Sequence, residues 1–221
     1  MTTETTGQLL CSCCGGASSP PQHFCATCEH ILPMPDRVSY FEFMELPIQL
    51  SLDARLLQQT FYRLSRQFHP DYYQNRPGPE QKAALERSAA LNRAYDTLQD
   101  TVKRVEYYMK LVGFVSEGKK NQVPPDLMME ILDLQEKLDD QQSASPEQKL
   151  ALAREIGVAI AGMREKLEEA SAKLEDLCVQ HDQADLADRA AFLQQLRDTI
   201  DRSNYLRRII QNTESVSGTS S

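Results

Sequence analysis

Four cysteines near the N-terminus have the residue type and the spacing of a metal site. Cys11 and Cys14 form one C-x-x-C pair, and Cys25 and Cys28 form a second pair after ten intervening residues. Two such pairs at this separation are typical of a tetrahedral thiolate site, most often for zinc, with iron as the alternative. Because four thiolates leave no coordination position open, the pattern predicts a structural metal rather than a catalytic one.

The segment around these cysteines, residues 1–38, is expected to depend on its metal for folding. A segment of fewer than about 40 residues rarely folds unaided, whereas structural zinc contributes on the order of 10 kcal/mol of apparent binding free energy. Cys13 is surplus to the four ligands and could compete with them. His23 and His30 lie close by in the sequence. We expect both at the surface, because four cysteines already satisfy the ion.

A second stretch with a potential chemical role, His69-Pro70-Asp71, lies between two amphipathic runs. The first run begins near Asp53, and its apolar residues recur at helical spacing. They are Leu57, Phe61, Leu64 and Phe68. We expect Ser51 to cap this helix and Pro70 to end it, because proline has no N–H and restricts the residue before it. The second run repeats the spacing with Ala84, Ser88, Leu91, Tyr95 and Leu98.

Two antiparallel helices with His-Pro-Asp at the connecting tip resemble the J-domain, the module with which co-chaperones activate chaperones of the seventy-kilodalton heat-shock class. The run Leu91–Leu98 is similar to that family's third helix, and the resemblance covers residues 39–113. It implies that His69, Pro70 and Asp71, here called the His-Pro-Asp turn, dock on the chaperone and promote its ATP hydrolysis. The chemistry would then belong to the partner.

Positive charge on the first of these helices fits the same resemblance. Arg63 and Arg66 lie three residues apart and off the apolar face. One interpretation is a solvated helix face, whereas the resemblance implies that both arginines meet an acidic surface on the chaperone. Tyr72 departs from the family pattern, in which a lysine often follows the aspartate. The predicted docking surface therefore consists of the His-Pro-Asp turn, Arg63 and Arg66.

The C-terminal part is expected to be an antiparallel three-helix bundle. Residues 114–123 are polar and contain a glycine, which predicts a linker. Three helical runs joined by short connections then span residues 124–212, and residues 213–221 are expected to be a flexible tail. The middle run carries a heptad-like seam, which leaves a homodimer open. The seam residues are Ile156, Ile160, Met163, Leu167, Ala170, Leu174 and Leu177.

The first helix of this bundle holds more apolar residues than one core stripe needs. At about 100° per residue, Met128, Met129 and Leu132 fall away from the stripe, and Glu136 shares their side. Tyr205 on the last helix also points outward by this count. We call Met128, Met129, Leu132 and Tyr205 the outward patch. It predicts a client-binding surface, since methionine suits an adaptable contact; isolated surface residues are the alternative.

The order of cysteine pairs, J-domain and acidic three-helix bundle resembles the HscB family of co-chaperones, which serve iron–sulfur cluster assembly, in its zinc-bearing form. The resemblance implies two partners, a chaperone of the HscA or DnaK type and a cluster scaffold protein of the IscU type. It also implies that the outward patch, together with Asp133 and Glu136, holds the scaffold. Asp133 stands where glutamate is common in the family, which keeps the charge but shortens its reach.

Composition limits the other functions that the chain could have. The net charge is −8. Residues 124–212 hold 11 Lys/Arg against 18 Asp/Glu, a net of −7, which argues against nucleic acid as the main partner. A nucleic-acid-binding zinc module would also need basic residues near its cysteines, yet residues 1–38 contain only Arg37. A J-domain protein for a different client stays open.

The sequence contains no pattern typical of an enzyme or a membrane protein. It has no nucleophile–base motif, no phosphate-binding loop and no apolar run of the roughly 18 residues that a membrane span needs. The first residues read as neither a secretory signal nor a transit peptide, which favours the cytoplasm. The expected fold is all-α: a J-domain hairpin followed by a three-helix bundle and preceded by a small four-cysteine segment.

Overall fold

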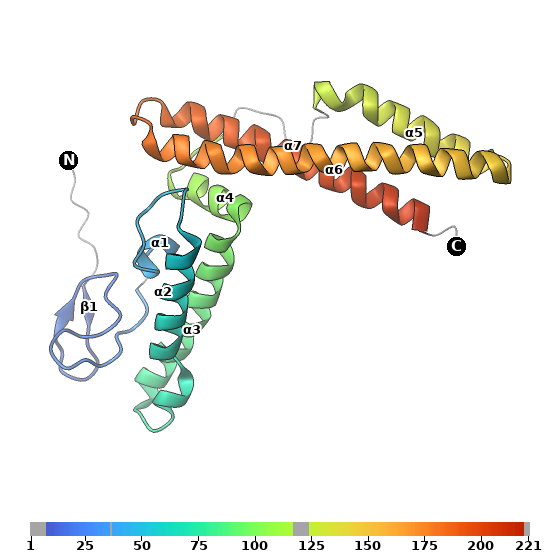
Figure 1. Cartoon of the computed structure of the whole chain (residues 1–221). Coiled ribbons are helices and arrows are strands. Elements are labelled where there is room, and N and C mark those ends of the chain that lie inside the picture. Colours follow the sequence, from blue (N-terminus) through green and yellow to red (C-terminus); the bar gives the residue numbers. More distant parts are fainter. Residues whose placement is uncertain (1–7, 36, 117–123, 219–221) are drawn as a thin grey trace. The chain divides into compact units, whose positions relative to one another are not determined.

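The computed structural model describes residues 8–35, 37–116 and 124–218. The chain divides into two compact units, Met1–Val112 and Gly113–Ser221. Helices make up most of the described residues (Figure 1), which confirms the predicted all-α fold. Within the described residues, no helix is long and apolar enough to cross a membrane. Most of the expected linker, residues 117–123, lies outside the described part of the chain.

The N-terminal segment of the first unit consists of two similar hairpins. Strands β1 (Leu9–Leu10) and β2 (Ala17–Ser18) pair antiparallel in the first, and a single bridge joins Phe24 to Ile31 in the second. In each hairpin the first cysteine receives a hydrogen bond at its carbonyl from the residue four positions on, Gly15 or Glu29. Both of these residues have a positive φ. Each hairpin therefore forms one turn that presents one cysteine pair.

The rest of the first unit is a helical hairpin with a short helix at either end. The helices are α1 (Tyr40–Phe43), α2 (Ala54–Gln67), the 3₁₀ turn η1 (Pro70–Tyr73), α3 (Gly78–Gln99) and α4 (Thr101–Leu111). The expected cap of α2 was wrong: Asp53, and not Ser51, accepts the N–H groups of Arg55 and Leu56. An aspartate next to the first helical residue fits the N-cap position better than a serine two residues earlier.

The apolar faces of α2 and α3 meet along the hairpin, as their spacing predicted. Leu57, Leu64 and Phe68 of α2 are buried, as are Ala84, Leu91 and Leu98 of α3. Phe61 is half-buried and stacks on Tyr95, with 4.2 Å between the ring centroids. This packing places the connection between α2 and α3, which contains the His-Pro-Asp turn, at the end of the hairpin (Figure 1).

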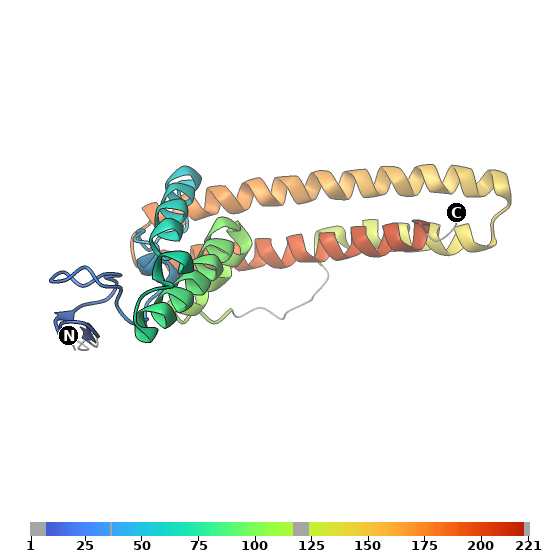
Figure 2. The same ribbon diagram turned by 90° about the horizontal axis from the view of Figure 1, so that it is seen from below.

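The second unit is built from three helices around one apolar core. A 3₁₀ turn, η2 (Pro125–Leu127), precedes α5 (Met128–Ser143), α6 (Pro146–Gln183) and α7 (Arg189–Gly218). Ser145 and Gln148 form a capping box at the start of α6. In Figure 2 the long helices α6 and α7 run side by side, and α5 returns along one end of them. The shared core consists of Leu127, Ile131, Leu134, Ile156, Met163, Leu206 and Ile210.

Two expectations about this unit change in the structure. Helix α7 continues to Gly218, so residues 213–218, assigned to a flexible tail, are helical; Thr213 is buried and its hydroxyl donates to the Ile209 carbonyl. The seam of α6 is used within the chain, because five of its seven residues are buried and Ile160 and Leu167 pack against the shared core. The seam is therefore not free to form a homodimer.

A leucine-to-alanine substitution in this core should destabilise the bundle. Leu206 is 1% exposed, and truncating a buried leucine costs about 2–5 kcal/mol through lost apolar contact and a residual cavity. We expect Leu206→Ala to lower the urea midpoint of the far-UV circular dichroism transition. Leu186→Ala is the matched control, because Leu186 is 84% exposed, and it should leave the midpoint unchanged. Equal midpoints for both variants would contradict the assigned core.

Candidate functional site

The four predicted metal ligands come together at the facing turns of the two N-terminal hairpins. The sulfur atoms of Cys11, Cys14, Cys25 and Cys28 all lie within 4.8 Å of one another. Three of the Sγ–Sγ distances are 3.4 Å for Cys14–Cys28, 3.5 Å for Cys11–Cys28 and 3.6 Å for Cys14–Cys25. Zn–S bonds of about 2.3 Å in a tetrahedron place the sulfurs roughly 3.8 Å apart. The four thiols thus fit a tetrahedral ion.

Backbone N–H groups around these sulfurs favour the thiolate form that a metal requires. The N–H of Gly16 points at the Cys14 sulfur from 3.4 Å, and a Cβ at Gly16 would lie only 3.1 Å from that sulfur. The N–H groups of Thr27 and Cys28 lower the pKa of the Cys25 thiol to about 6, whereas burial and the neighbouring thiols raise the pKa of Cys14 and of Cys28. A bound metal would cross-link the two hairpins and supply folding free energy, with no open position for catalysis.

Removing the metal should expose all four of these thiols to solvent. The N-terminal segment has a small core of Cys11, Cys25 and Leu32, which is too small to hold the hairpins without an added cross-link. We expect four additional thiols to react with a disulfide reagent after chelation, whereas Cys13 is exposed and reacts in both states. Cys178 is buried in the other unit and should stay slow. Identical titrations with and without chelator would contradict a four-thiolate metal site.

The expectation that His23 lies at the surface was wrong. His23 is 4% exposed, and its pKa falls to about 4, first through burial and then through the charge of Arg87. The Arg87 guanidinium donates to Nδ1 of His23 over 2.6 Å, so Nε2 carries the ring proton and donates to the Phe43 carbonyl over 3.0 Å. The reason is long-range packing: His23 belongs to the N-terminal segment, and its ring contacts Phe43 of α1, Phe68 at the end of α2 and Arg87 of α3.

The other two surplus groups, Cys13 and His30, lie beside the metal site. His30 is partly buried, with Nδ1 2.9 Å from the Cys28 carbonyl and Nε2 3.8 Å from a Glu80 carboxylate oxygen. Cys13, Cys28 and His30 have ligand atoms within 4.8 Å of one another. Cys13 and His30 are therefore close enough to compete for a ligand position, while both nitrogens of His23 are engaged elsewhere.

The His-Pro-Asp turn presents its side chains to solvent. His69 and Asp71 are exposed, and the His69 Nδ1 accepts the N–H of Asp71 over 3.3 Å. The turn is braced from both sides: the Tyr73 hydroxyl donates to the Gln67 carbonyl, and the Gln81 amide donates to the carbonyls of Gln74 and Arg76. A braced turn with exposed polar side chains suits contact with a partner, since none of these groups is needed for the core.

The two arginines predicted to accompany this turn are in different situations. Arg63 forms an ion pair with Glu45, a residue with positive φ that follows the C-cap of α1, Met44. Arg66 lies in the last turn of α2 and is exposed. Both belong to the same helix as Phe68, the residue before the His-Pro-Asp turn. The first unit therefore brings the predicted docking residues onto one helix and the turn that follows it.

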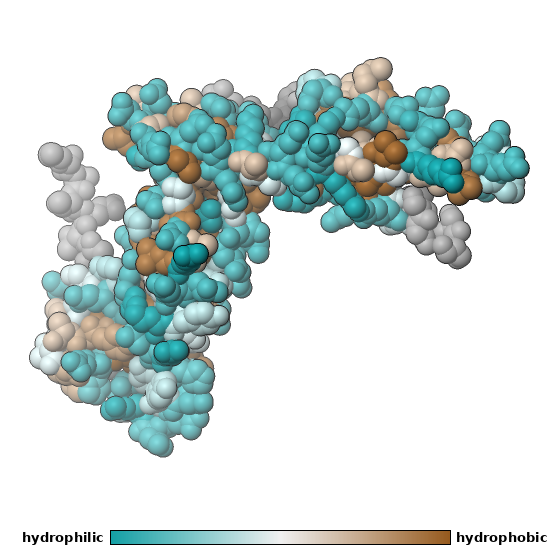
Figure 3. Space-filling view, in the orientation of Figure 1, coloured by the Kyte–Doolittle hydropathy of each residue, from teal (hydrophilic) through white to brown (hydrophobic). Residues whose placement is uncertain are grey.

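The outward patch of the second unit is only partly as predicted. Met128, Met129 and Leu132 are 46%, 77% and 53% exposed. Tyr205 is instead half-buried, because it packs against the shared core beneath Arg208, whose guanidinium carbon lies 5.1 Å from the ring centroid. Figure 3 shows a mostly hydrophilic visible face on this unit with separate hydrophobic groups between. Met128, Met129 and Leu132 thus form an exposed apolar row on α5.

The charged neighbours of this row point partly toward α6. Asp133 accepts a hydrogen bond from Lys137 over 2.7 Å, and Lys137 lies 3.6 Å from Glu155 of α6. Asp133 and Lys137 also line a groove of about 460 Å³ between α5 and α6. Glu136 is exposed. The family resemblance implied two carboxylates at the scaffold-binding surface. Glu136 is exposed beside the apolar row, while Asp133 is bonded to Lys137 at its edge.

Comparisons with known proteins agree with this architecture. The DnaJ domain family matches residues 39–107. A co-chaperone protein HscB homolog from Vibrio cholerae serotype O1 (strain M66-2) is 35% identical over 103 residues, which cover 46% of this chain and 60% of that relative. The chain thus matches less than two thirds of the relative's length.

Solved structures extend the similarity along most of the chain. Chaperone HscB from Vibrio cholerae is 26% identical, with a TM-score of 0.55, and the match covers 82% of this chain and 99% of that one. Human co-chaperone protein HscB shares the fold at 23% identity, with a TM-score of 0.66 over 92% of this chain and 96% of that one. The chain thus matches the DnaJ domain at residues 39–107 and is similar in sequence and in fold to HscB co-chaperones.

Proposed function

We propose that this protein is a co-chaperone in iron–sulfur cluster assembly. Its J-domain would dock on an ATP-bound chaperone of the seventy-kilodalton class, of the HscA or DnaK type, and stimulate ATP hydrolysis there. Its bundle would hold a cluster scaffold protein of the IscU type. The protein would then perform no catalysis of its own, and the cytoplasm is its proposed compartment.

One observation carries this proposal: the His-Pro-Asp turn is exposed and braced at the end of a helical hairpin that matches the DnaJ domain. A group that contacts a partner must be accessible and held in place, because ordering it on binding would cost conformational entropy. The exposed Arg66 adds positive charge beside it. Positive charge would speed association with an acidic surface on the chaperone.

The scaffold-binding half of the proposal is supported by the exposed row on α5. Met128, Met129 and Leu132 are apolar, adjacent on one helix face and not used by the core. Met-rich surfaces adapt to partners, and apolar anchors with nearby carboxylates such as Glu136 give both affinity and orientation. Joining this row to a J-domain would raise the effective concentration of scaffold at the chaperone.

For the metal site we propose structural zinc held by Cys11, Cys14, Cys25 and Cys28. Four thiolates at tetrahedral spacing suit zinc, and backbone donors to sulfur support the thiolates. Metal analysis of the purified protein by mass spectrometry should give one zinc per chain. Iron in its place would change the metal assignment but not the structural role.

The steady-state ATPase rate of a specialised chaperone tests the whole proposal. It is measured with scaffold protein alone, with this protein alone and with both. We expect stimulation by this protein and a further, more than additive, increase with scaffold. Stimulation without any effect of scaffold would favour the second candidate, a J-domain protein for a different client. A chaperone that responds to another co-chaperone but not to this protein would overturn the proposal.

A further inference from the structure

Phe68, the residue directly before the His-Pro-Asp turn, is partly enclosed by the N-terminal segment. Phe68 is fully buried, and its ring centroid lies 4.9 Å from that of His23 and 6.0 Å from that of Phe24. The guanidinium carbon of Arg87 lies 5.9 Å from the same centroid. Phe68 also forms the C-cap of α2, with its N–H bonded to the Leu64 carbonyl. The start of the turn thus depends on residues that belong to the metal-binding segment.

Arg87 of α3 directs its hydrogen bonds at that segment. The side chain is fully buried, and it donates through Nε to the Leu32 carbonyl over 3.0 Å, through Nη2 to the Pro33 carbonyl over 2.9 Å and through Nη1 to His23. A buried guanidinium is costly unless its donors are satisfied, and an arginine side chain cannot shed its proton. The N-terminal segment must therefore stay folded against α3 for this burial to be tolerated.

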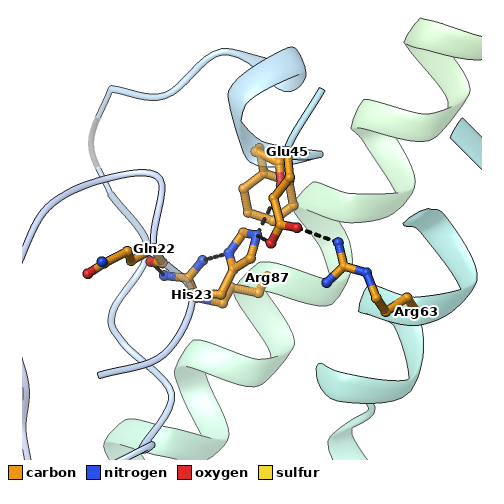
Figure 4. A network of polar contacts seen from close by, with 6 residues as sticks. Gln22, His23, Glu45, Arg63 and Arg87 are labelled. Carbon is orange, nitrogen blue, oxygen red and sulfur yellow. Dashed lines mark hydrogen bonds and ion pairs between the residues drawn. The ribbon is translucent and has the colours of Figure 1, made fainter. Parts of the chain in front are cut away.

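His23 also contacts residues at the end of α1, and through them α2 (Figure 4). Its Nε2 donates to the Phe43 carbonyl at the end of α1 and lies 3.7 Å from a Glu45 carboxylate oxygen. The other oxygen of Glu45 accepts from Arg63, one of the proposed chaperone-docking residues. His23 and Arg87 together thus link the N-terminal segment, through Glu45, to α2, the helix that carries Arg63. We call this pair the His23–Arg87 strut.

The hairpin that carries two of the proposed metal ligands, Cys25 and Cys28, also holds His23 in place. The Leu32 N–H bonds to the His23 carbonyl over 3.0 Å, and between them the Cys25 N–H bonds to the His30 carbonyl over 2.9 Å. The hairpin with Cys25 and Cys28 at its turn thus fixes the spacing between His23 and Leu32. A groove of about 290 Å³ lies between this hairpin and the His-Pro-Asp turn. It is lined by Cys28 and His30 on one side and by Tyr72 and Arg76 on the other.

We propose that the metal-bound N-terminal segment is a positioning element of the J-domain. Through the His23–Arg87 strut and Phe68, it sets the orientation of the His-Pro-Asp turn and of Arg63. This role goes beyond self-contained folding of the segment, and its functional consequence rests on the proposed chaperone docking. His23 and Arg87 are positioning residues, because both are buried and act through Phe68 and Glu45.

Hydrogen exchange on the full chain tests the link without any chaperone. The readout is the N–H groups of Tyr72 and Arg76, which bond to the carbonyls of His69 and Tyr73 inside the turn. We expect them to exchange about tenfold faster in metal-stripped protein and in Arg87→Met, while amides in the middle of α2 and α3 keep their protection. Arg93→Met is the matched control, since Arg93 lies on the same helix but is exposed. It should change nothing.

Two results of this experiment would overturn the inference. Unchanged exchange in the turn after metal removal would show that the segment folds independently of it. Loss of protection throughout α2 and α3 would show a general stabiliser rather than a positioning element. Arg87→Lys keeps a charged donor group and should recover part of the protection lost in Arg87→Met. If Arg87 only filled space, the two variants would behave alike.

The chaperone assay then measures the consequence. Protein stripped of metal and freed of chelator, and Arg87→Met, should need about tenfold more co-chaperone for half-maximal ATPase stimulation, with the same maximal rate at saturation. The positioning role would be rejected if neither the co-chaperone concentration for half-maximal stimulation nor the hydrogen exchange of the turn changed. If metal-loaded wild type does not stimulate a competent chaperone, the proposed function fails; the exchange of the turn still decides whether the segment positions it.

Discussion

Replacing His69 by glutamine will abolish most of the ATPase stimulation of a seventy-kilodalton chaperone. His69 is exposed and contributes nothing to the apolar core, so the fold should survive the substitution. Glutamine keeps a polar side chain of similar length but loses the flat ring and the Nδ1 that accepts the Asp71 N–H. Loss of a central contact residue costs about 2 kcal/mol or more, which corresponds to about a 30-fold weaker interaction. The measurement is the steady-state rate over a range of co-chaperone concentrations.

A neighbouring substitution separates docking from general damage to the turn. Asn75 follows in the same loop and is exposed, so Asn75→Gln should stimulate the chaperone like wild type. Both variants should keep the far-UV circular dichroism spectrum and the scaffold affinity of wild type, because the outward patch belongs to the other unit. Full stimulation by His69→Gln would move the docking surface away from the His-Pro-Asp turn.

The parts of the fold that the sequence predicted are those fixed by local patterns. Apolar spacing identified the faces of α2 and α3 because a helix repeats every 3.6 residues whatever lies around it. The two C-x-x-C pairs predicted which four cysteines come together, since tetrahedral coordination by thiolates would impose this spacing. Ser145, Pro146 and Gln148 identified the start of α6 through the capping box. In each case the determining residues lie within a few positions of one another.

The parts that the sequence did not predict depend on packing between distant segments. His23 is buried because α3 and α1 surround it, and 64 residues separate it from Arg87. Arg87 carried a readable signal: it lies three residues after Ala84 and four before Leu91, on the buried face of α3. A charge on an apolar stripe predicts a buried ion that needs partners. The sequence alone did not say that backbone carbonyls of the N-terminal segment would supply them.

The position of Tyr205 in the second unit likewise depends on packing that local sequence patterns do not predict. Counting 100° per residue from Leu196 placed it on the outer face, but its ring packs on the shared core, to which residues of α5 also contribute. Tyr205 is half-buried and the Arg208 guanidinium lies over its ring, so only part of the side chain is open to a partner. The most exposed apolar contacts of the outward patch are therefore on α5.

Truncating two residues of that row will strongly weaken binding of an IscU-type scaffold protein. Met128 and Leu132 lie four positions apart on one face of α5, and both are exposed, so Met128→Ala/Leu132→Ala removes apolar contact area without opening a core cavity. Each truncation of a central interface residue costs about 1–2 kcal/mol, so the pair should raise the Kd by roughly 30- to 1000-fold. Isothermal titration calorimetry with purified scaffold measures this change directly.

Leu150→Ala provides the matched control, because Leu150 is an exposed leucine on α6, outside the patch. It should bind scaffold like wild type, and all variants should unfold at the wild-type urea concentration. The double variant should also still stimulate the chaperone when scaffold is absent, since the docking turn is intact. It should lose the additional stimulation that scaffold provides. Wild-type affinity in the double variant would place the client surface elsewhere on the bundle, with the groove between α5 and α6 beside Asp133 as the next surface to test.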